Sequence, residues 1–101
     1  MPAYWVARSK INDPVAYKKY TDLVPAIIAK YNGKVLSRGA RYEMMEGPEK
    51  FERFVIIEFP TFEEGVACFR SPEYDAAASF RRTDGAGEVE TVMLEAGEFT
   101  K

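Results

Sequence analysis

Six residues carry groups suited to ligand binding or proton transfer and fall on predicted strands or helices. They are Tyr17, Tyr20, Arg38, Glu58, Tyr74 and Arg81. A phenol carries a hydroxyl on an apolar ring, and a guanidinium offers a planar set of donors that fits an anion. This set is typical of a cleft that binds a small, partly polar organic molecule. No catalytic residue is singled out, and whether the protein is an enzyme is left open.

The sequence contains no histidine, so it lacks the commonest general base and the commonest metal ligand. Proton transfer would therefore rest on a carboxylate or a tyrosine. Ser71 precedes a proline as a helix cap does, and Cys68 adjoins an apolar helix stripe, so neither indicates a nucleophile. The acidic residues lack the spacing of a metal site. We expect no metal and no cofactor.

Glu58 lies in the apolar stretch Arg53–Pro60, RFVIIEFP, where an isolated charge is costly. If the segments on either side of a turn at Gly47–Lys50 pair as antiparallel strands, Arg38 comes opposite Glu58 or Phe59. We therefore expect an ion pair between Arg38 and Glu58. Such a pair either fixes the register of the strands or lines a ligand cleft, and the structural role is favoured.

The tyrosines and the remaining arginines allow a second interpretation as well. Tyr17 and Tyr20 lie at helical spacing, which is more typical of core residues than of a binding site. Arg53 and Arg81 could each clamp an anionic ligand through paired donors. Structural pairing or solvation is the simpler interpretation of both arginines.

Composition excludes several classes of protein. The chain has 101 residues, enough for one domain over residues 1–101. Its 14 basic and 16 acidic residues are interspersed, which argues against nucleic-acid binding. A single cysteine and no leader-like start favour a cytoplasmic protein. No segment has the apolar length of a bilayer span, so no membrane partner is expected.

The elements expected along the chain follow the order βαββαβ, with the second helix split. Strands are expected at 3–9, 34–46, 51–59 and 89–97, and helices at 14–31, 62–69 and 72–82. Glycine predicts a bulge at Gly39–Ala40, and Pro25 predicts a kink or break in the first helix. This order is the ferredoxin-like arrangement of an α+β protein, with a four-stranded antiparallel sheet in the order 4-1-3-2.

Both faces of the strand at 51–59 are apolar. Val55, Ile57 and Phe59 alternate with Phe54 and Ile56, whereas a sheet with one wet face should alternate apolar with polar residues. The chain has no spare helix to cover the second face. We therefore expect a homodimer in which two sheets pack face to face.

In this order and spacing, the motifs resemble the domain of unknown function family 1330, in the dimeric α/β-barrel superfamily. The matching elements are the aromatic first strand, Asp13–Pro14 with Tyr17 and Tyr20, Tyr31–Asn32–Gly33, Arg38–Gly39, Glu46–Gly47, Arg53, Glu58–Phe59–Pro60, Ser71–Pro72–Glu73–Tyr74, Arg81 and Gly97. The resemblance implies a homodimeric ferredoxin-like fold with a cleft between sheet and helices. Superfamily members include cofactor-independent monooxygenases, isomerases and haem enzymes, so the resemblance implies no one reaction.

Two functions remain open. The first is a small-molecule binder or cofactor-free enzyme of the monooxygenase or isomerase kind, acting by proton transfer or oxygen chemistry on an enolisable aromatic or keto compound. The second is a non-catalytic dimerisation or interaction module whose ion pairs are only structural.

Overall fold

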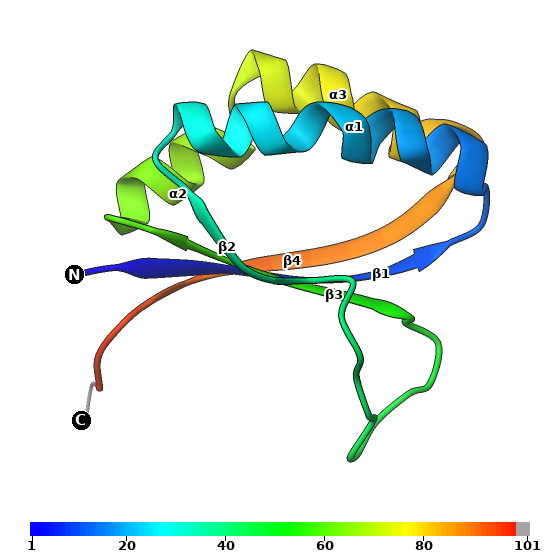
Figure 1. Ribbon diagram of the computed structural model, residues 1–101, viewed down its shortest axis with the longest axis horizontal. Helices are drawn as coiled ribbons and strands as arrows, with labels where there is room; N and C mark the ends of the chain where they lie inside the picture. The colour runs from blue at the N-terminus through cyan, green and yellow to red at the C-terminus, as the bar shows by residue number, and fades with distance from the viewer. Residues whose placement is uncertain (99–101) are drawn as a thin grey trace.

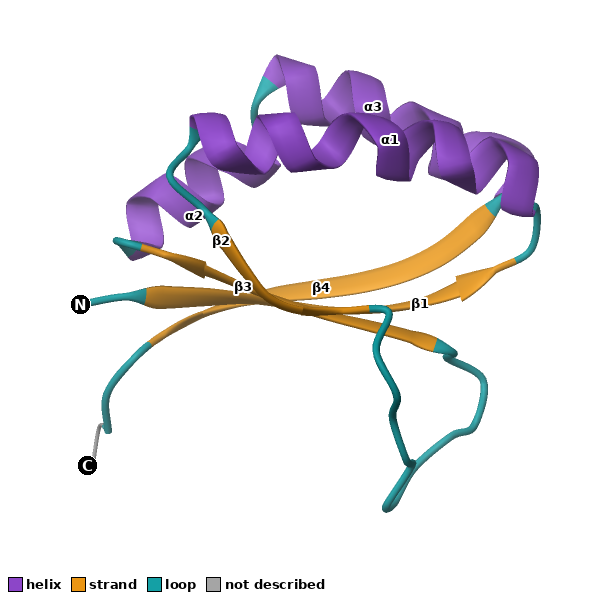
Figure 2. Cartoon of the chain, in the orientation of Figure 1, coloured by secondary structure: helices purple, strands orange, loops and turns teal. Residues whose placement is uncertain are grey.

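The chain folds into an antiparallel sheet whose one face is covered by helices (Figures 1 and 2). The computed structural model describes residues 1–98. The elements are β1 (Ala3–Ile11), α1 (Pro14–Lys30), β2 (Lys34–Arg38), β3 (Arg53–Phe59), α2 (Phe62–Phe69), α3 (Pro72–Arg82), the short η1 (Thr83–Gly85) and β4 (Gly87–Glu95). The sheet order β2-β3-β1-β4 confirms the predicted ferredoxin-like topology.

Helix α1 begins at the predicted Pro14 and ends at Lys30, one residue before the predicted end. The Asp13 carboxylate accepts hydrogen bonds from the amides of Val15 and Ala16, and Pro14 occupies the first turn, where its missing amide costs nothing. The helix runs unbroken through Pro25, so of the two outcomes predicted there, a kink or a break, the break is wrong. Proline removes one backbone hydrogen bond, whereas residues on both sides of it pack on the same core and hold the helix together.

Side-chain caps also start the two later helices. The Thr61 hydroxyl accepts a hydrogen bond from the amide of Glu64, and the Ser71 hydroxyl accepts one from the amide of Tyr74. These two caps explain why the second helical region is split, as predicted. None of the helices in residues 1–98 combines the length and apolar character needed to cross a membrane.

The register of β2 corrects the predicted ion pair. Lys34 lies opposite Glu58, and Arg38 lies opposite Val55, with an irregularity between Val35 and Ser37. The predicted pairing of Arg38 with Glu58 is therefore wrong, as is the predicted bulge at Gly39–Ala40. The strand ends at Arg38 because Gly39 adopts a φ of 63°, a left-handed conformation that turns the chain away from the sheet.

A loop over residues 39–52 replaces the predicted tight turn at Gly47–Lys50. The sequence-based register assumed that two long strands meet at a short turn, and an early exit from the sheet shifts every facing position. In Figure 1 this loop projects from the sheet on the side opposite the helices. It therefore extends the protein beyond the uncovered face of the sheet.

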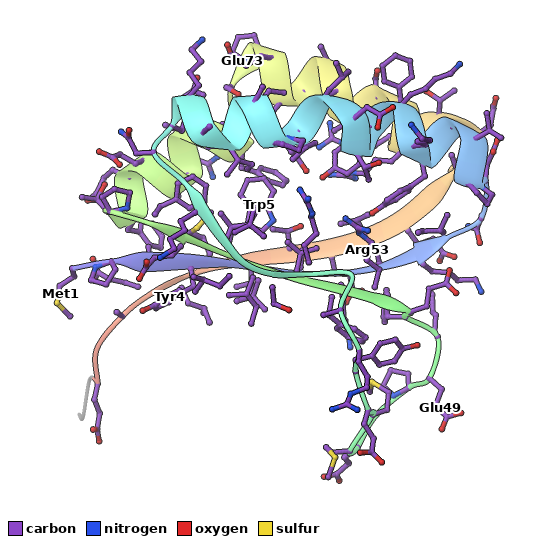
Figure 3. All side chains as sticks on the ribbon, in the orientation of Figure 1. Met1, Tyr4, Trp5, Glu49, Arg53 and Glu73 are labelled. Atoms are coloured by element: carbon purple, nitrogen blue, oxygen red, sulfur yellow. The ribbon has the colours of Figure 1, made fainter. Side chains whose placement is uncertain are left out.

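The two faces of the sheet have different surroundings. Val55, Ile57 and Phe59 belong to the core beneath the helices. Trp5 points into the same core (Figure 3). The remaining buried members of this core are Ile28, Cys68, Tyr74 and Ala78. The opposite face carries the apolar side chains of Tyr4, Val6, Phe54, Ile56, Val92 and Leu94. Ile56, Val92 and Leu94 are exposed in the single chain, so this face carries uncovered apolar area, alongside the charged residues Arg8, Glu58 and Glu90.

Candidate functional site

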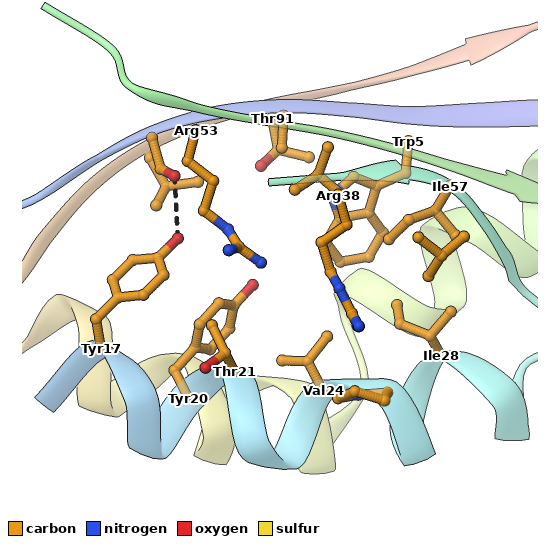
Figure 4. Close-up of a pocket in the computed structure, with 16 residues that line it drawn as sticks. Trp5, Tyr17, Tyr20, Thr21, Val24, Ile28, Arg38, Arg53, Ile57 and Thr91 are labelled. Atoms are coloured by element: carbon orange, nitrogen blue, oxygen red, sulfur yellow. Dashed lines mark hydrogen bonds between the residues drawn. The ribbon is translucent and has the colours of Figure 1, made fainter. Parts of the chain in front are cut away.

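A cleft lies between α1 and the helix-facing side of the sheet (Figure 4). Its walls include the apolar side chains of Trp5, Val24, Ile28, Val35, Val55 and Ile57. Its polar groups come from Ser9, Tyr17, Tyr20, Thr21, Arg38, Arg53 and Thr91. The empty cavity measures about 40 Å³, enough for a few water molecules. An apolar cleft with a few inward polar groups is the usual form of a small-molecule site.

Two arginines enter this cleft from the sheet. Arg38 is the last residue of β2 and is exposed, whereas Arg53 is the first residue of β3 and is half-buried. Among residues 1–98, no Asp or Glu side chain lines the cleft. Neither arginine forms a salt bridge within residues 1–98. The cleft therefore carries positive charge without a carboxylate to neutralise it, which favours an anionic ligand.

Tyr17 lines one end of the cleft (Figure 4). Its side chain is buried, and its hydroxyl donates a hydrogen bond to the Ser9 hydroxyl at 3.1 Å. A Cβ atom at Gly87 would lie 2.7 Å from the Tyr17 ring, so the glycine makes room for the ring. Burial raises the pKa of Tyr17 above its ordinary value. The phenol is therefore neutral at physiological pH.

Tyr20 belongs to a hydrogen-bonded row that joins α1 to α3. The hydroxyl oxygens of Tyr20 and Tyr74 lie 2.7 Å apart, and the Arg81 Nη2 donates to the Tyr74 hydroxyl at 3.1 Å. The Arg81 guanidinium also lies 5.1 Å from the centre of the Tyr20 ring, within cation–π range. Burial raises the pKa of Tyr20 strongly. Tyr20 therefore stays protonated and can donate a hydrogen bond.

The six candidate residues fall into three places. Tyr17, Tyr20 and Arg38 line the cleft, and Tyr74 and Arg81 lie behind Tyr20. Glu58 lies on the opposite face of the sheet, because it alternates with Ile57 and Phe59, whose side chains point toward the helices. Glu58 and Arg38 are therefore separated by the sheet itself. That these residues bind a ligand stays a prediction.

Sequence analysis gave Arg53 only as an alternative and did not find Ser9, Thr21 or Thr91. The sequence feature that could have placed Arg53 in the cleft is its two-residue spacing from Val55, because residues two apart on a strand lie on the same face of the sheet. The two-residue period does not reveal which face meets the helices. Ser9, Thr21 and Thr91 carry small hydroxyls without a distinctive pattern.

The remaining reactive groups are structural. Cys68 is buried in the core, and burial raises the pKa of its thiol to about 11, so it is an unreactive packing residue at neutral pH. The Ser71 hydroxyl caps α3. Both observations confirm the predicted roles. Within residues 1–98, no group of three or more His, Cys, Asp or Glu side chains could hold a metal ion.

Comparison with known proteins shows what the chain is similar to. Residues 2–96 match the family described as "Domain of unknown function (DUF1330)". No functionally curated protein matches the sequence. A crystal structure of a protein of unknown function from Rhodopseudomonas palustris is 22% identical, with a TM-score of 0.72, over 96% of this chain and 83% of that one.

Two further solved structures have the same fold at lower identity. A dimeric ferredoxin-like protein of unknown function from Jannaschia sp. is 12% identical, with a TM-score of 0.69, over 95% of this chain and 100% of that one. The cofactor-independent oxygenase SnoaB from Streptomyces nogalater is 14% identical, with a TM-score of 0.61, over 97% of this chain and 95% of that one. At these identities the likeness shows the fold alone.

Proposed function

The chain belongs to the DUF1330 family, and we propose that it binds a small organic acid with an apolar body in the cleft beneath α1. The observation that carries this proposal is the entry of Arg38 and Arg53 into an apolar cleft that no carboxylate lines. A guanidinium binds a carboxylate through paired hydrogen bonds. The apolar walls would hold the body of the ligand.

The size of the cleft indicates how such a ligand would enter. The cavity of about 40 Å³ is too small for an organic acid of several heavy atoms. In Figure 4 the Arg38 side chain extends across the cleft toward α1. Because Arg38 is exposed and has several rotatable bonds, it can swing outward and then close over the bound acid. Arg53 is half-buried and would supply the fixed contact.

The reaction, if the protein catalyses one, would be proton transfer or oxygen chemistry on an enolisable aromatic or keto acid. The likeness to a cofactor-independent oxygenase supports this class by analogy of fold only. Tyr20 supports it from the site, because a neutral phenol in the cleft can hydrogen-bond a carbonyl or enolate oxygen. The arginines would position the acid beside that phenol.

The binding proposal is tested with two probes of nearly equal shape, phenylacetate and its neutral amide, phenylacetamide. Chemical-shift titration of the wild type at millimolar concentrations should show that the acid binds and that the amide binds much more weakly. The shifts should concentrate on residues of α1 and on Arg53. Equal binding of both probes, or binding of neither, would refute the proposal.

We also propose that the protein is a homodimer formed through the uncovered face of the sheet. Val92 and Leu94 on this face are 50% and 49% exposed in the single chain, and such apolar area favours a partner surface. The loop over residues 39–52 projects on the same side and carries Met45, which is 88% exposed. The loop would therefore flank the partner. The Jannaschia relative is described as dimeric.

The second candidate function is a dimerisation module without a ligand. The apolar area on the sheet face is as consistent with this module as with an acid-binding dimer, because dimerisation does not require a cleft. The cleft arginines distinguish the candidates, since a purely structural module gains nothing from placing the half-buried Arg53, without a salt bridge among residues 1–98, in an apolar cleft. The acid-binding proposal therefore explains more of the structure.

A further inference from the structure

Arg81 is a buried cation without a carboxylate partner in the part of the chain that the structure describes. Its residue is 5% exposed, and its Nε atom has no hydrogen-bond partner among residues 1–98. Its guanidinium donates a hydrogen bond to the Tyr74 hydroxyl and lies near the rings of Tyr20 and Tyr74. Burying a guanidinium costs desolvation free energy unless hydrogen bonds or an opposite charge compensate for it. Here the hydrogen-bond partner is a phenol.

The hydrogen bonds that link Arg81, Tyr74 and Tyr20 favour donation from Arg81 to Tyr74 and from Tyr74 to Tyr20. A guanidinium has donors only, so the Tyr74 oxygen accepts from Arg81. Tyr74 is fully buried, and its own proton would be unpaired if Tyr20 were the donor between the two phenols. An unpaired buried donor is disfavoured. These contacts favour Tyr74 as the donor to Tyr20, whose hydroxyl oxygen lies 2.7 Å away.

If Tyr74 donates to Tyr20, the hydroxyl proton of Tyr20 is not used in that bond and can point into the cleft. In Figure 4, Tyr20 rises from α1 and Arg53 descends from the sheet, and both side chains end inside the cleft. Each donation in the row polarises the next hydroxyl, so the last donor is strengthened. A strengthened donor beside a cation suits an oxygen acceptor close to a carboxylate.

We propose that Tyr20 is the specificity-determining donor of the cleft, held in its donating orientation by Tyr74 and Arg81, and that it selects acids with a second acceptor oxygen next to the carboxylate. The ligand class is the 2-oxo acids. Arg53 would bind the carboxylate, and Tyr20 would donate to the adjacent carbonyl oxygen. This inference rests on the proposed binding of an acid and specifies which acid.

The test compares benzoylformate with phenylacetate, because the two acids differ only in a carbonyl in place of a methylene group. The wild type should bind benzoylformate about fivefold to tenfold more tightly, as expected for one additional hydrogen bond. Tyr20→Phe should lose this preference and retain its affinity for phenylacetate. Equal affinities in the wild type, or a preserved preference in Tyr20→Phe, would overturn the inference and leave acid binding standing. Failure of both acids to bind would overturn the inference and the proposed function together.

The positioning role of Tyr74 needs a separate variant and a readout beyond stability. Tyr74→Phe removes the hydrogen-bonded link between Arg81 and Tyr20 and leaves every cleft-lining group in place. The preference for benzoylformate should fall while phenylacetate binding is retained. Tyr31→Phe is the matched control, because its hydroxyl bonds to Glu73 outside the cleft, and it should keep the full preference.

A fluorine resonance reports on Tyr20 directly. In protein labelled with 3-fluorotyrosine, the Tyr20 resonance, assigned by its loss in Tyr20→Phe, should shift on addition of benzoylformate and much less with phenylacetate. In Tyr74→Phe that difference should shrink. A Tyr20 resonance that responds equally to both acids in the wild type would contradict donation to the second oxygen, even if the Tyr74→Phe variant proved poorly folded.

Discussion

The hydroxyl oxygens of Tyr20 and Tyr74 lie 2.7 Å apart, although the residues are separated by 54 positions in the sequence. Tyr20 is on α1 and Tyr74 is on α3, so the contact joins the two long helices above the sheet. Because Arg81 donates to the Tyr74 hydroxyl, the same contact also connects the buried Arg81 with Tyr20 in the cleft. One pair of phenols therefore contributes to both the packing of the helices and the polarity of the site.

Tyr74→Phe should destabilise the protein by about 1–3 kcal/mol, because it deprives the buried Arg81 of its hydrogen-bond acceptor. Urea unfolding at neutral pH measures the change. Tyr42→Phe is the matched control, since Tyr42 is 47% exposed, and its stability should be unchanged within about 0.5 kcal/mol. A Tyr74→Phe variant as stable as the wild type would show that Arg81 finds another acceptor.

Arg53→Met should weaken phenylacetate binding by about tenfold or more, because a charged hydrogen-bonded contact is lost. Its stability should be equal to or above that of the wild type, since Arg53 has no salt bridge within residues 1–98. Titration and thermal unfolding measure the two effects separately. Arg82→Met is the control, because Arg82 pairs with Asp75 on the surface, and it should bind as the wild type does. Unchanged binding by Arg53→Met would remove Arg53 from the site.

The carboxylate of Glu73 should make stability depend on pH below its ordinary pKa of 4.5. The hydrogen bonds from Lys30 and Tyr31 lower the pKa of Glu73 to about 2. The folded state thus favours the ionised form, and this stabilisation is present above pH 4.5 and is lost as the pH falls toward 2. Glu73→Gln should be less stable than the wild type at pH 7.

The difference between Glu73→Gln and the wild type should shrink when urea unfolding is repeated at successively lower pH between 4.5 and 2. Glu49→Gln is the control, because Glu49 is an exposed loop residue. Its stability relative to the wild type should not follow the same trend. A Glu73→Gln difference that is constant over this range would show that the contacts do not favour the ionised carboxylate.

The sequence predicted the elements because their signals are local. Asp13, Thr61 and Ser71 each cap the helix that follows them, and these hydrogen bonds form within three residues. The predicted order of elements then restricts the sheet to few topologies. For this reason the helix starts and the strand order agree with the structure.

The contacts of the site depended on features that are not local. The partner of Arg38 depends on where β2 leaves the sheet, and the left-handed Gly39 ends the strand early. A change of register moves every facing pair, so Arg38 meets Val55 instead of Glu58. Alternation along β3 puts Arg53 and Glu58 on opposite faces of the sheet. Which of these faces the helices cover is known only from the folded structure.

Ile56→Glu combined with Val92→Glu should convert the proposed dimer into a monomer, because both side chains lie on the uncovered sheet face and are exposed in the single chain. Two carboxylates brought into an apolar interface would lose their water without gaining a partner, which should raise the dissociation constant by about a hundredfold or more. Sedimentation velocity of the wild type and the variant at micromolar concentration measures the change.

Leu23→Glu is the matched control for the dimer, because Leu23 is an exposed apolar residue of α1 on the other side of the molecule. It adds a charge of the same kind without touching the sheet face, so the dimer should persist. A wild type that sediments as a monomer would refute the proposed interface directly. Phenylacetate titration of a folded Ile56→Glu, Val92→Glu monomer then separates the two proposals. The cleft lies on the helix-facing side of the sheet, away from the proposed interface, so binding should survive dissociation.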